Sequence, residues 1–197
     1  MSAPTADEQD GLDMARLVQG REAALDDLMA RHAEKLFHYL LRSLQDEHDA
    51  ADLAQETFAK VYHHRARFDP SQRFTTWLYA IASNLVRDRY RWRARHPQVS
   101  LDAENEQTET SIKDTLRSEA PAPDEQLQSG ERAAAVRRAV AALPEELRQP
   151  LILSVYQGLP QAEIAAILKC SAKAVETRIY RARQHLRTAL AELLHSP

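Results

Sequence analysis

The sequence has few of the residues that a disulfide framework, a zinc cage or a β-rich fold would need. One cysteine, Cys170, stands alone among 197 residues, which excludes an internal disulfide and a cage of thiolate ligands. Glycine occurs four times and aromatic residues make up 6% of the chain, whereas 44% of the residues are hydrophobic. This composition favours helices over sheets and suffices for buried cores. The eight histidines show no paired ligand spacing, so we expect neither a metal nor a cofactor.

Long apolar runs are also missing. No stretch reaches the roughly 18 apolar residues of a membrane span, so we expect no membrane contact of the protein's own. The first ten residues, MSAPTADEQD, lack the basic and apolar parts of a signal peptide, and we therefore expect a cytoplasmic protein. The sequence contains no glycine-rich phosphate loop and no pattern of a catalytic triad. We accordingly expect no enzymatic activity.

Charge is distributed unevenly along the chain, although its net value is only −3. Residues 96–130 hold eight acidic side chains against Lys113 and Arg117, a net charge of −6. Residues 87–95 carry five arginines and one aspartate, and residues 169–187 carry six basic side chains and one glutamate. Two basic patches of this kind predict an anionic partner, and the acidic segment lies between them in the sequence.

Apolar residues recur with a helical period along most of the chain, which predicts an all-α protein of two helical domains. Residues 96–127 are rich in Ser, Thr, Glu and Pro and lack that period, which predicts a flexible acidic linker between domains at 11–95 and 128–194. Pro150 should kink or restart its helix. The expected helices lie near 11–19, 21–44, 48–65, 73–94, 128–142, 144–157, 160–168 and 171–194.

The clearest pattern is LPQAEIAAILKCSAKAVETRIYRARQHLRTAL, residues 159–190. A short helix is followed by a break at residues 169–171, and Ser171 is a good N-cap for the next helix. That helix has a single apolar stripe formed by Val175, Ile179, Ala182 and Leu186. The pattern is typical of a helix-turn-helix that reads the major groove. An amphipathic hairpin with a solvated basic face is the plainer alternative.

The opposite face of this second helix offers hydrogen-bonding groups of several kinds. Arg178 lies nearer the edge of the apolar stripe, where it suits a phosphate or a salt bridge within the protein. The candidate DNA-binding residues of this helix are Lys173, Glu176, Thr177, Arg178, Tyr180 and Arg181.

An acidic stripe marks the helix HDAADLAQETFAKVYHH, residues 48–64. Asp49, Asp52 and Glu56 recur at spacings of three and four and therefore share one face, whereas Phe58 points toward a core. Such a stripe is usually only solvated, and acids near a helix start are favourable in any case. By itself it is weak evidence for a binding surface.

The next helix ends in the basic segment RDRYRWRAR, residues 87–95. Its five arginines do not share one face, but three of them, Arg87, Arg91 and Arg95, form a stripe on a helix. Arginines beside aromatic rings suit the phosphates of DNA and also unstacked bases. The plainer alternative is a solubilising helix end whose arginines complement the helix dipole. The candidate DNA-binding residues of this helix are Trp77, Asn84, Arg87, Asp88 and Arg91.

Three segments together resemble a known family. In order and spacing, DAADLAQETFAKVY, FTTWLYAIASNLVRDRYR and LPEELRQPLILSVYQGLPQAEIAAILKCSAKAVETRIYRARQHLRTAL are similar to the two conserved domains of bacterial extracytoplasmic-function sigma factors. The resemblance covers residues 11–95 and 128–192. The turn departs from the family pattern, because Lys169 and Cys170 stand where the family usually has a glycine and an aliphatic residue.

The resemblance implies a role for each segment. The acidic helix would dock on the clamp helices of the largest subunit of core RNA polymerase through Asp49, Asp52, Gln55, Glu56 and Phe58. The basic helix would open and read the minus-ten promoter element, and the loop RARFDPSQRF before it would capture a flipped base. The recognition helix would read the minus-thirty-five element. The linker would thread toward the active site and the RNA exit channel as an RNA mimic.

The resemblance also implies contact with the flap of the second-largest polymerase subunit and control by an anti-sigma factor. A stand-alone helix-turn-helix regulator remains the alternative to a sigma factor. Such a regulator has no need of both an acidic docking helix and an arginine–aromatic helix, and it usually needs a dimer interface, for which the sequence offers no heptad run.

Overall fold

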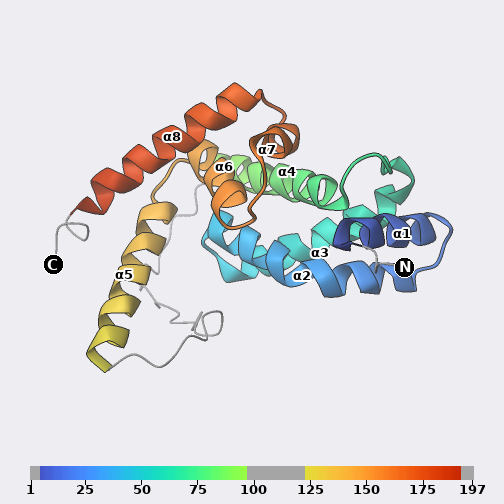
Figure 1. The fold of residues 1–197 in the computed structure, drawn as a ribbon, viewed down its shortest axis with the longest axis horizontal. Helices are drawn as coiled ribbons and strands as arrows, with labels where there is room; N and C mark the ends of the chain where they lie inside the picture. The colour runs from blue at the N-terminus through green and yellow to red at the C-terminus, as the bar shows by residue number, and fades with distance from the viewer. Residues whose placement is uncertain (1–4, 97–122, 192–197) are drawn as a thin grey trace.

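The structure, a computed structural model, describes residues 5–96 and 123–191, and within those ranges it contains only helices and turns. The all-α prediction is therefore confirmed. Figure 1 shows the arrangement of an N-terminal lobe and a C-terminal lobe. The N-terminal lobe consists of α1 (Ala6–Val18), α2 (Ala23–Leu44), α3 (Glu47–His64), a 3-10 turn (Arg65–Arg67) and α4 (Phe74–Arg95); the C-terminal lobe consists of α5 (Pro123–Ala141), α6 (Glu145–Val155), α7 (Gln161–Leu168) and α8 (Ala172–Ala189).

Two element boundaries differ from the expected ones. Helix α1 begins five residues early, because Thr5 and Glu8 form a capping box that satisfies the first backbone N–H groups. Helix α5 begins at Pro123, inside the expected linker, where proline suits the first helical position. The rest of that linker and the role expected of it lie outside the described residues.

Pro150 does not restart its helix. Helix α6 is continuous from Glu145 to Val155 with Pro150 inside it and buried. The proline removes one backbone donor, but the residues around it, Leu147, Leu151, Ile152 and Leu153, are buried as well. We attribute the continuity to this apolar packing, which holds α6 in place despite the missing bond.

The two lobes share one hydrophobic core. Within it, Tyr39 of α2, Phe74 and Leu78 of α4, and Ile152 and Ile164 of the C-terminal lobe are each almost fully buried. Helix α7 lies against α4, and α6 lies against α2, as the overlay of the orange and green helices in Figure 1 also shows. No helix within the described ranges is long and apolar enough to cross a bilayer.

Buried ion pairs stabilise the packing of α1 against α2. Asp10 and Asp13 are fully buried, and Arg31 reaches both, donating from Nε to Asp10 at 2.9 Å and from Nη2 to Asp13 at 2.6 Å. His32 Nε2 lies 2.8 Å from the second oxygen of Asp10. Burial alone would raise the pKa of Asp13, but the hydrogen bonds from Arg31 and Gln9 and the charges of Arg31 and Arg16 outweigh it and hold that pKa below its usual value.

Arg31→Ala should lower the free energy of unfolding by about 3 kcal/mol at neutral pH, because it leaves two buried carboxylates without their main partner. A carboxyl with a depressed pKa stabilises the fold above its unfolded value, 3.8 for Asp13, and loses that contribution as the pH falls through its folded pKa. The difference between wild type and Arg31→Ala should therefore shrink as the pH falls below 3.8. Urea unfolding at pH 7 and pH 3 measures both effects. Lys35→Ala, an exposed change on the same helix, is the control and should alter the free energy of unfolding by less than about 0.5 kcal/mol. The explanation would be contradicted if Lys35→Ala destabilised the protein as much as Arg31→Ala does. It would also be contradicted if the loss in Arg31→Ala were the same at both pH values.

Candidate functional site

Three members of the predicted docking set form an exposed stripe on α3. Asp52 and Glu56 each keep about half of their side chain exposed, at 50% and 48%, and Gln55 is exposed beside them. Glu56 pairs with Lys60 at 3.3 Å and Asp52 with His48 at 3.6 Å, one turn away in each case. Ion pairs this exposed contribute little to stability, so they are easily exchanged for contacts with a partner.

The other two members of that set do not lie on the stripe. Asp49 is buried, and its carboxylate accepts from Arg89 and Arg93 of α4, each at 2.5 Å. Phe58 is only 4% exposed and belongs to the core. Both side chains are buried against neighbouring elements in this arrangement, and their expected contact with a partner stays a prediction.

The polar flank of α4 brings together the expected DNA-binding residues of that helix. Arg87 donates to Asn84 Oδ1 at 3.2 Å, and Asp88 and Arg91 form an exposed ion pair. The arginines that are not on this flank have another task, because Arg89 and Arg93 turn toward α3 and hold Asp49. The helical period therefore divides the basic segment into an inward and an outward set.

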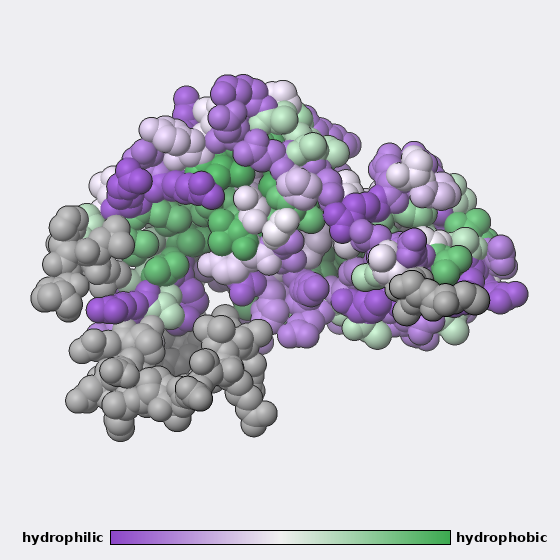
Figure 2. Space-filling model, viewed as in Figure 1, coloured by the Kyte–Doolittle hydropathy of each residue, from purple (hydrophilic) through white to green (hydrophobic). Residues whose placement is uncertain are grey.

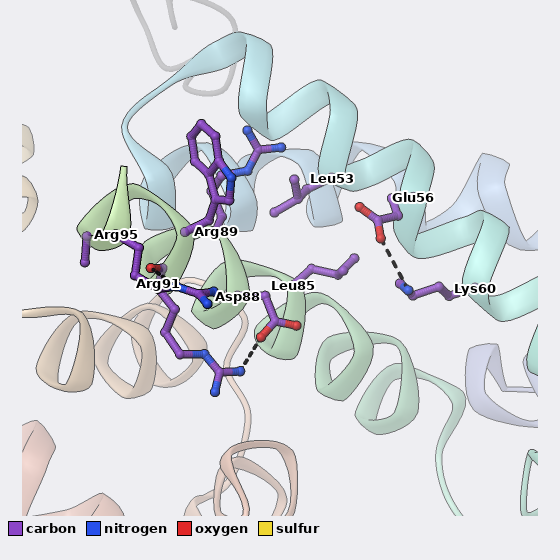
Figure 3. A pocket seen from close by; sticks show the side chains of 10 residues that line it. Leu53, Glu56, Lys60, Leu85, Asp88, Arg89, Arg91 and Arg95 are labelled. Carbon is purple, nitrogen blue, oxygen red and sulfur yellow. Dashed lines mark hydrogen bonds and ion pairs between the residues drawn. The ribbon is translucent and has the colours of Figure 1, made fainter. Parts of the chain in front are cut away.

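An open groove of about 1040 Å³ runs between α3 and α4. Figure 3 shows Glu56 and Lys60 on one wall and Asp88, Arg91 and Arg95 on the other, with Leu53 and Leu85 between them. Trp92, which is 43% exposed, also lines the groove and stacks on His96 with ring centroids 4.9 Å apart. The acidic stripe and the basic flank thus adjoin one another across a single depression.

The loop before α4 is built around aromatic rings. Trp77 packs on Phe68 and Phe74, with ring centroids 5.3 and 6.4 Å apart, so it is only partly exposed. Within the loop, the backbone N–H of Ser71 donates to Asp69 at 2.9 Å and holds the pKa of that carboxyl below its usual value. An aromatic cluster next to an ordered turn is suited to stacking a base that has left the duplex.

Helix α8 presents the polar face that the sequence predicts. Ser171 caps it by accepting from the N–H of Ala174 at 3.1 Å, and its apolar stripe is buried at Val175, Ile179 and Ala182. Figure 2 shows hydrophilic residues along the outer side of α8 and hydrophobic ones beneath it. Tyr180 is 63% exposed on that outer side.

Arg178 lies apart from the rest of this face. The outward residues are Lys173, Glu176, Thr177, Tyr180 and Arg181, of which Lys173 and Glu176 form an ion pair at 2.9 Å. Arg178 instead approaches the sulfur of Cys170 at 3.7 Å and lines a small cavity that it shares with Arg87 of α4. In this arrangement it is not part of the exposed polar face.

The turn between α7 and α8 is made by a residue that rarely makes such turns. Lys169 has φ 52° and ψ 50°, the left-handed conformation that glycine adopts without strain. For a residue with a Cβ this conformation costs on the order of 1–2 kcal/mol. Lys169 thus takes a backbone conformation in which a glycine would be unstrained, between the end of α7 and the start of α8.

The sequence did not reveal the role of two polar residues of α6, Arg148 and Gln149. Both are buried and both donate to or accept from the N-terminal lobe. The only signal available beforehand was their place in the otherwise apolar run LRQPLIL, where a polar side chain must find partners. Which partners those are depends on how the lobes pack.

Comparisons with known proteins agree with this geometry. Residues 28–96 match the family description "Sigma-70 region 2", and residues 133–186 match "Sigma-70, region 4". The chain is 33% identical over 187 residues to the RNA polymerase sigma-H factor of Pseudomonas aeruginosa, covering 95% of this chain and 96% of that one. It is 32% identical over 176 residues to the ECF RNA polymerase sigma factor SigW of Bacillus subtilis, covering 89% and 93%. Among solved structures it resembles CnrH in complex with the cytosolic domain of CnrY, at a TM-score of 0.67 and 28% identity, covering 94% and 99%.

Lys169→Gly should raise the free energy of unfolding by about 0.5–1 kcal/mol, because glycine relieves the left-handed strain but loses more freedom on folding. Chemical denaturation of the full chain measures the change. Arg183→Gly, in the middle of α8, is the matched control and should lower stability by about 1 kcal/mol. A loss of stability in Lys169→Gly would show that the lysine side chain stabilises the turn.

Proposed function

The chain belongs to the extracytoplasmic-function sigma factors of bacterial RNA polymerase, and from this premise we propose how its two lobes share the work of that family. A sigma factor binds core RNA polymerase and directs it to promoters. We assign polymerase docking and the minus-ten element to residues 11–95, and the minus-thirty-five element to residues 128–194. The observation that carries the assignment is the groove at which the acidic stripe of α3 and the basic flank of α4 meet.

Docking on the clamp helices of the largest polymerase subunit rests on Asp52, Gln55 and Glu56. These side chains are exposed and close together, and Asp52 and Glu56 pair with His48 and Lys60 of their own helix. A basic partner can therefore replace those pairs without disturbing the core. Asp49 and Phe58 act indirectly, because their buried contacts fix the position and orientation of α3 against the neighbouring helices. Contact of the C-terminal lobe with the flap of the second-largest subunit completes the attachment.

Promoter recognition combines two chemistries. On α4, Arg87, Arg91 and Arg95 suit phosphates, while Asn84 and Asp88 suit bases at the edge of the opened region, and the ring of Trp77 lies next to the loop that would hold a flipped base. On α8, Lys173 and Arg181 suit phosphates, whereas Thr177 and Tyr180 suit base edges and Glu176 can accept from cytosine N4. Arg178, which approaches Cys170, lies at the edge of this set.

The function needs no catalytic group of the protein's own, because polymerase supplies the chemistry. Its place of action is the cytoplasm, where polymerase and promoter DNA are. An anti-sigma factor is the natural regulator, since the similar structure of CnrH is a complex with the cytosolic domain of CnrY.

Run-off transcription with core polymerase and a library of genomic fragments tests the function directly. Addition of this protein should create discrete start sites that share two upstream elements.

Glu56→Lys should raise the concentration needed for half-maximal transcription at least about tenfold, equivalent to 1.4 kcal/mol of lost binding, with an unchanged circular dichroism spectrum. Glu34→Lys, an exposed charge reversal on α2, serves as the control. Unchanged polymerase affinity in Glu56→Lys would refute docking by the α3 stripe, and operator binding without any new start site would favour the stand-alone regulator.

The double change Lys173→Ala and Arg181→Ala should weaken transcription from promoters that contain a minus-thirty-five element. It should also reduce the slope of log affinity against log salt by about 2, one for each phosphate contact removed. Promoters without that element should be little affected. Arg187→Ala, in the last turn of the same helix, is the control for a nonspecific loss of charge, and an equal loss on both promoter classes would show that the variant misfolds.

A further inference from the structure

A short loop at residues 69–73 lies between the 3-10 turn and α4, and all five of its residues are exposed. Its sequence DPSQ, residues 69–72, is typical of a β-turn with proline in the second position. The backbone N–H of Gln72 donates to the carbonyl oxygen of Asp69 at 3.0 Å, and that of Ser71 donates to the Asp69 carboxylate at 2.9 Å. These local bonds fix the shape of the loop, but they do not fix its position against the rest of the lobe.

Two phenylalanines anchor the loop to one aromatic cluster. Phe68 precedes the loop and Phe74 follows it as the first residue of α4, and their ring centroids lie 6.3 Å apart. Trp77, one turn further along α4, contacts both rings. Phe74 is only 1% exposed, so its ring belongs to the core although the loop that it ends faces solvent. The position of the loop therefore depends on how the Phe74 ring is held.

His32 of α2 contacts the ring of Phe74. The two ring centroids lie 5.2 Å apart and the rings are tilted by 53°, which is within the range of favourable aromatic pairs. Nε2 of His32 lies 2.8 Å from Oδ2 of Asp10, a fully buried residue of α1 whose other oxygen accepts from Arg31. A buried carboxylate needs such partners, and the bond to one ring nitrogen fixes how the imidazole is turned. Asp10 therefore sets the orientation of the ring against which Phe74 packs.

Helix α1 also holds the last residue of the loop. Nη2 of Arg73 lies 2.8 Å from Asp7, in the first turn of α1, and Nη1 lies 2.8 Å from Glu163 of α7. Helix α1 contacts the 3-10 turn before the loop and α4 after it. It thus reaches the loop by two routes, an exposed one through the ion pair with Arg73 and a buried one through His32.

A loop that is held in advance is the kind that capture of a base requires. A base that leaves the duplex loses its pairing and stacking, and the protein must replace both. A pocket that has to become ordered at the same moment binds more weakly, because ordering opposes binding. The contacts of α1 remove that cost, since they are already made in the protein without DNA.

We propose that α1 positions the 69–73 loop for its base, and that Asp7, Asp10 and His32 are positioning residues that act on the minus-ten strand without touching it. The proposal deepens the function assigned above and rests on it, because that function places a flipped base at this loop. Loss of either route should weaken capture of the base and leave docking of the α3 stripe on polymerase unchanged.

The fluorescence of Trp77 can follow the loop in the protein without DNA. The chain has two tryptophans, and Trp92→Phe leaves Trp77 as the only reporter of the aromatic cluster. In this background His32→Leu and Asp7→Ala should each shift the emission to longer wavelength and increase quenching by acrylamide. The ion pair of Asp7 is exposed and contributes little to stability, so Asp7→Ala tests the proposal even where His32→Leu folds poorly.

Each variant has a matched control. His38→Leu changes another histidine of α2, one that lies near Glu34 of its own helix. Asp26→Ala removes an exposed acid from the first turn of α2, as Asp7→Ala does from the first turn of α1. Neither control should alter the emission or the quenching of Trp77.

Base capture can be measured by removing the base. Holoenzyme is bound to promoter forks with a single-stranded minus-ten strand, taken from a promoter found by run-off transcription, with an abasic site at each position in turn. The captured position is the one at which the abasic site weakens wild-type binding most. There the ratio of the abasic to the intact Kd should fall at least about threefold in His32→Leu and about twofold in Asp7→Ala, as expected for coupled groups. His32→Gln, whose amide can still donate to Asp10, should keep most of the ratio, and both controls should keep all of it.

The ratio separates positioning from a general loss of structure, because a smaller folded fraction weakens binding to both forks equally. A loosened Trp77 together with a reduced ratio in His32→Leu and Asp7→Ala supports the role of α1. If either the Trp77 signal or the ratio is unchanged in both variants, that role is overturned and the sigma function stands. A wild-type holoenzyme that binds every abasic fork as tightly as the intact one overturns base capture by the loop itself, and the positioning role falls with it.

Discussion

The arrangement of the molecule depends on one oxygen atom, Oε1 of Gln149, and the two hydroxyls that point at it. Polar groups are buried only where their partners are in place, so Tyr39, Ser83 and Gln149 together define a single way in which the lobes fit. Apolar packing between α4 and α7 would tolerate sliding, because hydrophobic contact has little direction. The hydrogen bonds fix how the lobes are aligned. Arg148 adds bonds to carbonyl oxygens near the ends of α2 and α5.

Helix α4 shows how a single segment serves both the fold and its ligands. A turn of 3.6 residues separates alternate arginines onto different faces, so Arg89 and Arg93 hold the buried Asp49 while Arg91 and Arg95 face the groove. The inward pairs fix the angle between α3 and α4. The acidic stripe of α3 and the basic flank of α4 are therefore held beside one another at the same groove.

Local features of the chain were predictable and nonlocal ones were not. The cap at Ser171, the apolar stripe of α8 and the exposed acids Asp52 and Glu56 follow from spacing and residue type alone. Asp49 shares the spacing of that stripe, yet it is buried, because its partners lie forty residues or more away on α4. Phe58 came into the docking set through the family resemblance, although its helical position already pointed to the core. The hydrogen bonds between the lobes join residues that lie from 58 to 110 positions apart, and no local pattern specifies them.

The same separation in sequence has a consequence during synthesis. The N-terminal lobe is complete once residue 96 has left the ribosome, whereas α6 follows some fifty residues later and α8 nearly a hundred. At roughly 5–20 residues per second, the newborn lobe exists for about 3–20 s without the helices that cover α2 and α4. During that interval the faces of α2 and α4 that later pack against α6 and α7 are uncovered while the chain is still attached to the ribosome. Tyr39 and Ser83, whose hydroxyls are buried in the complete chain, therefore face water during synthesis and find their partner Gln149 only after α6 has emerged.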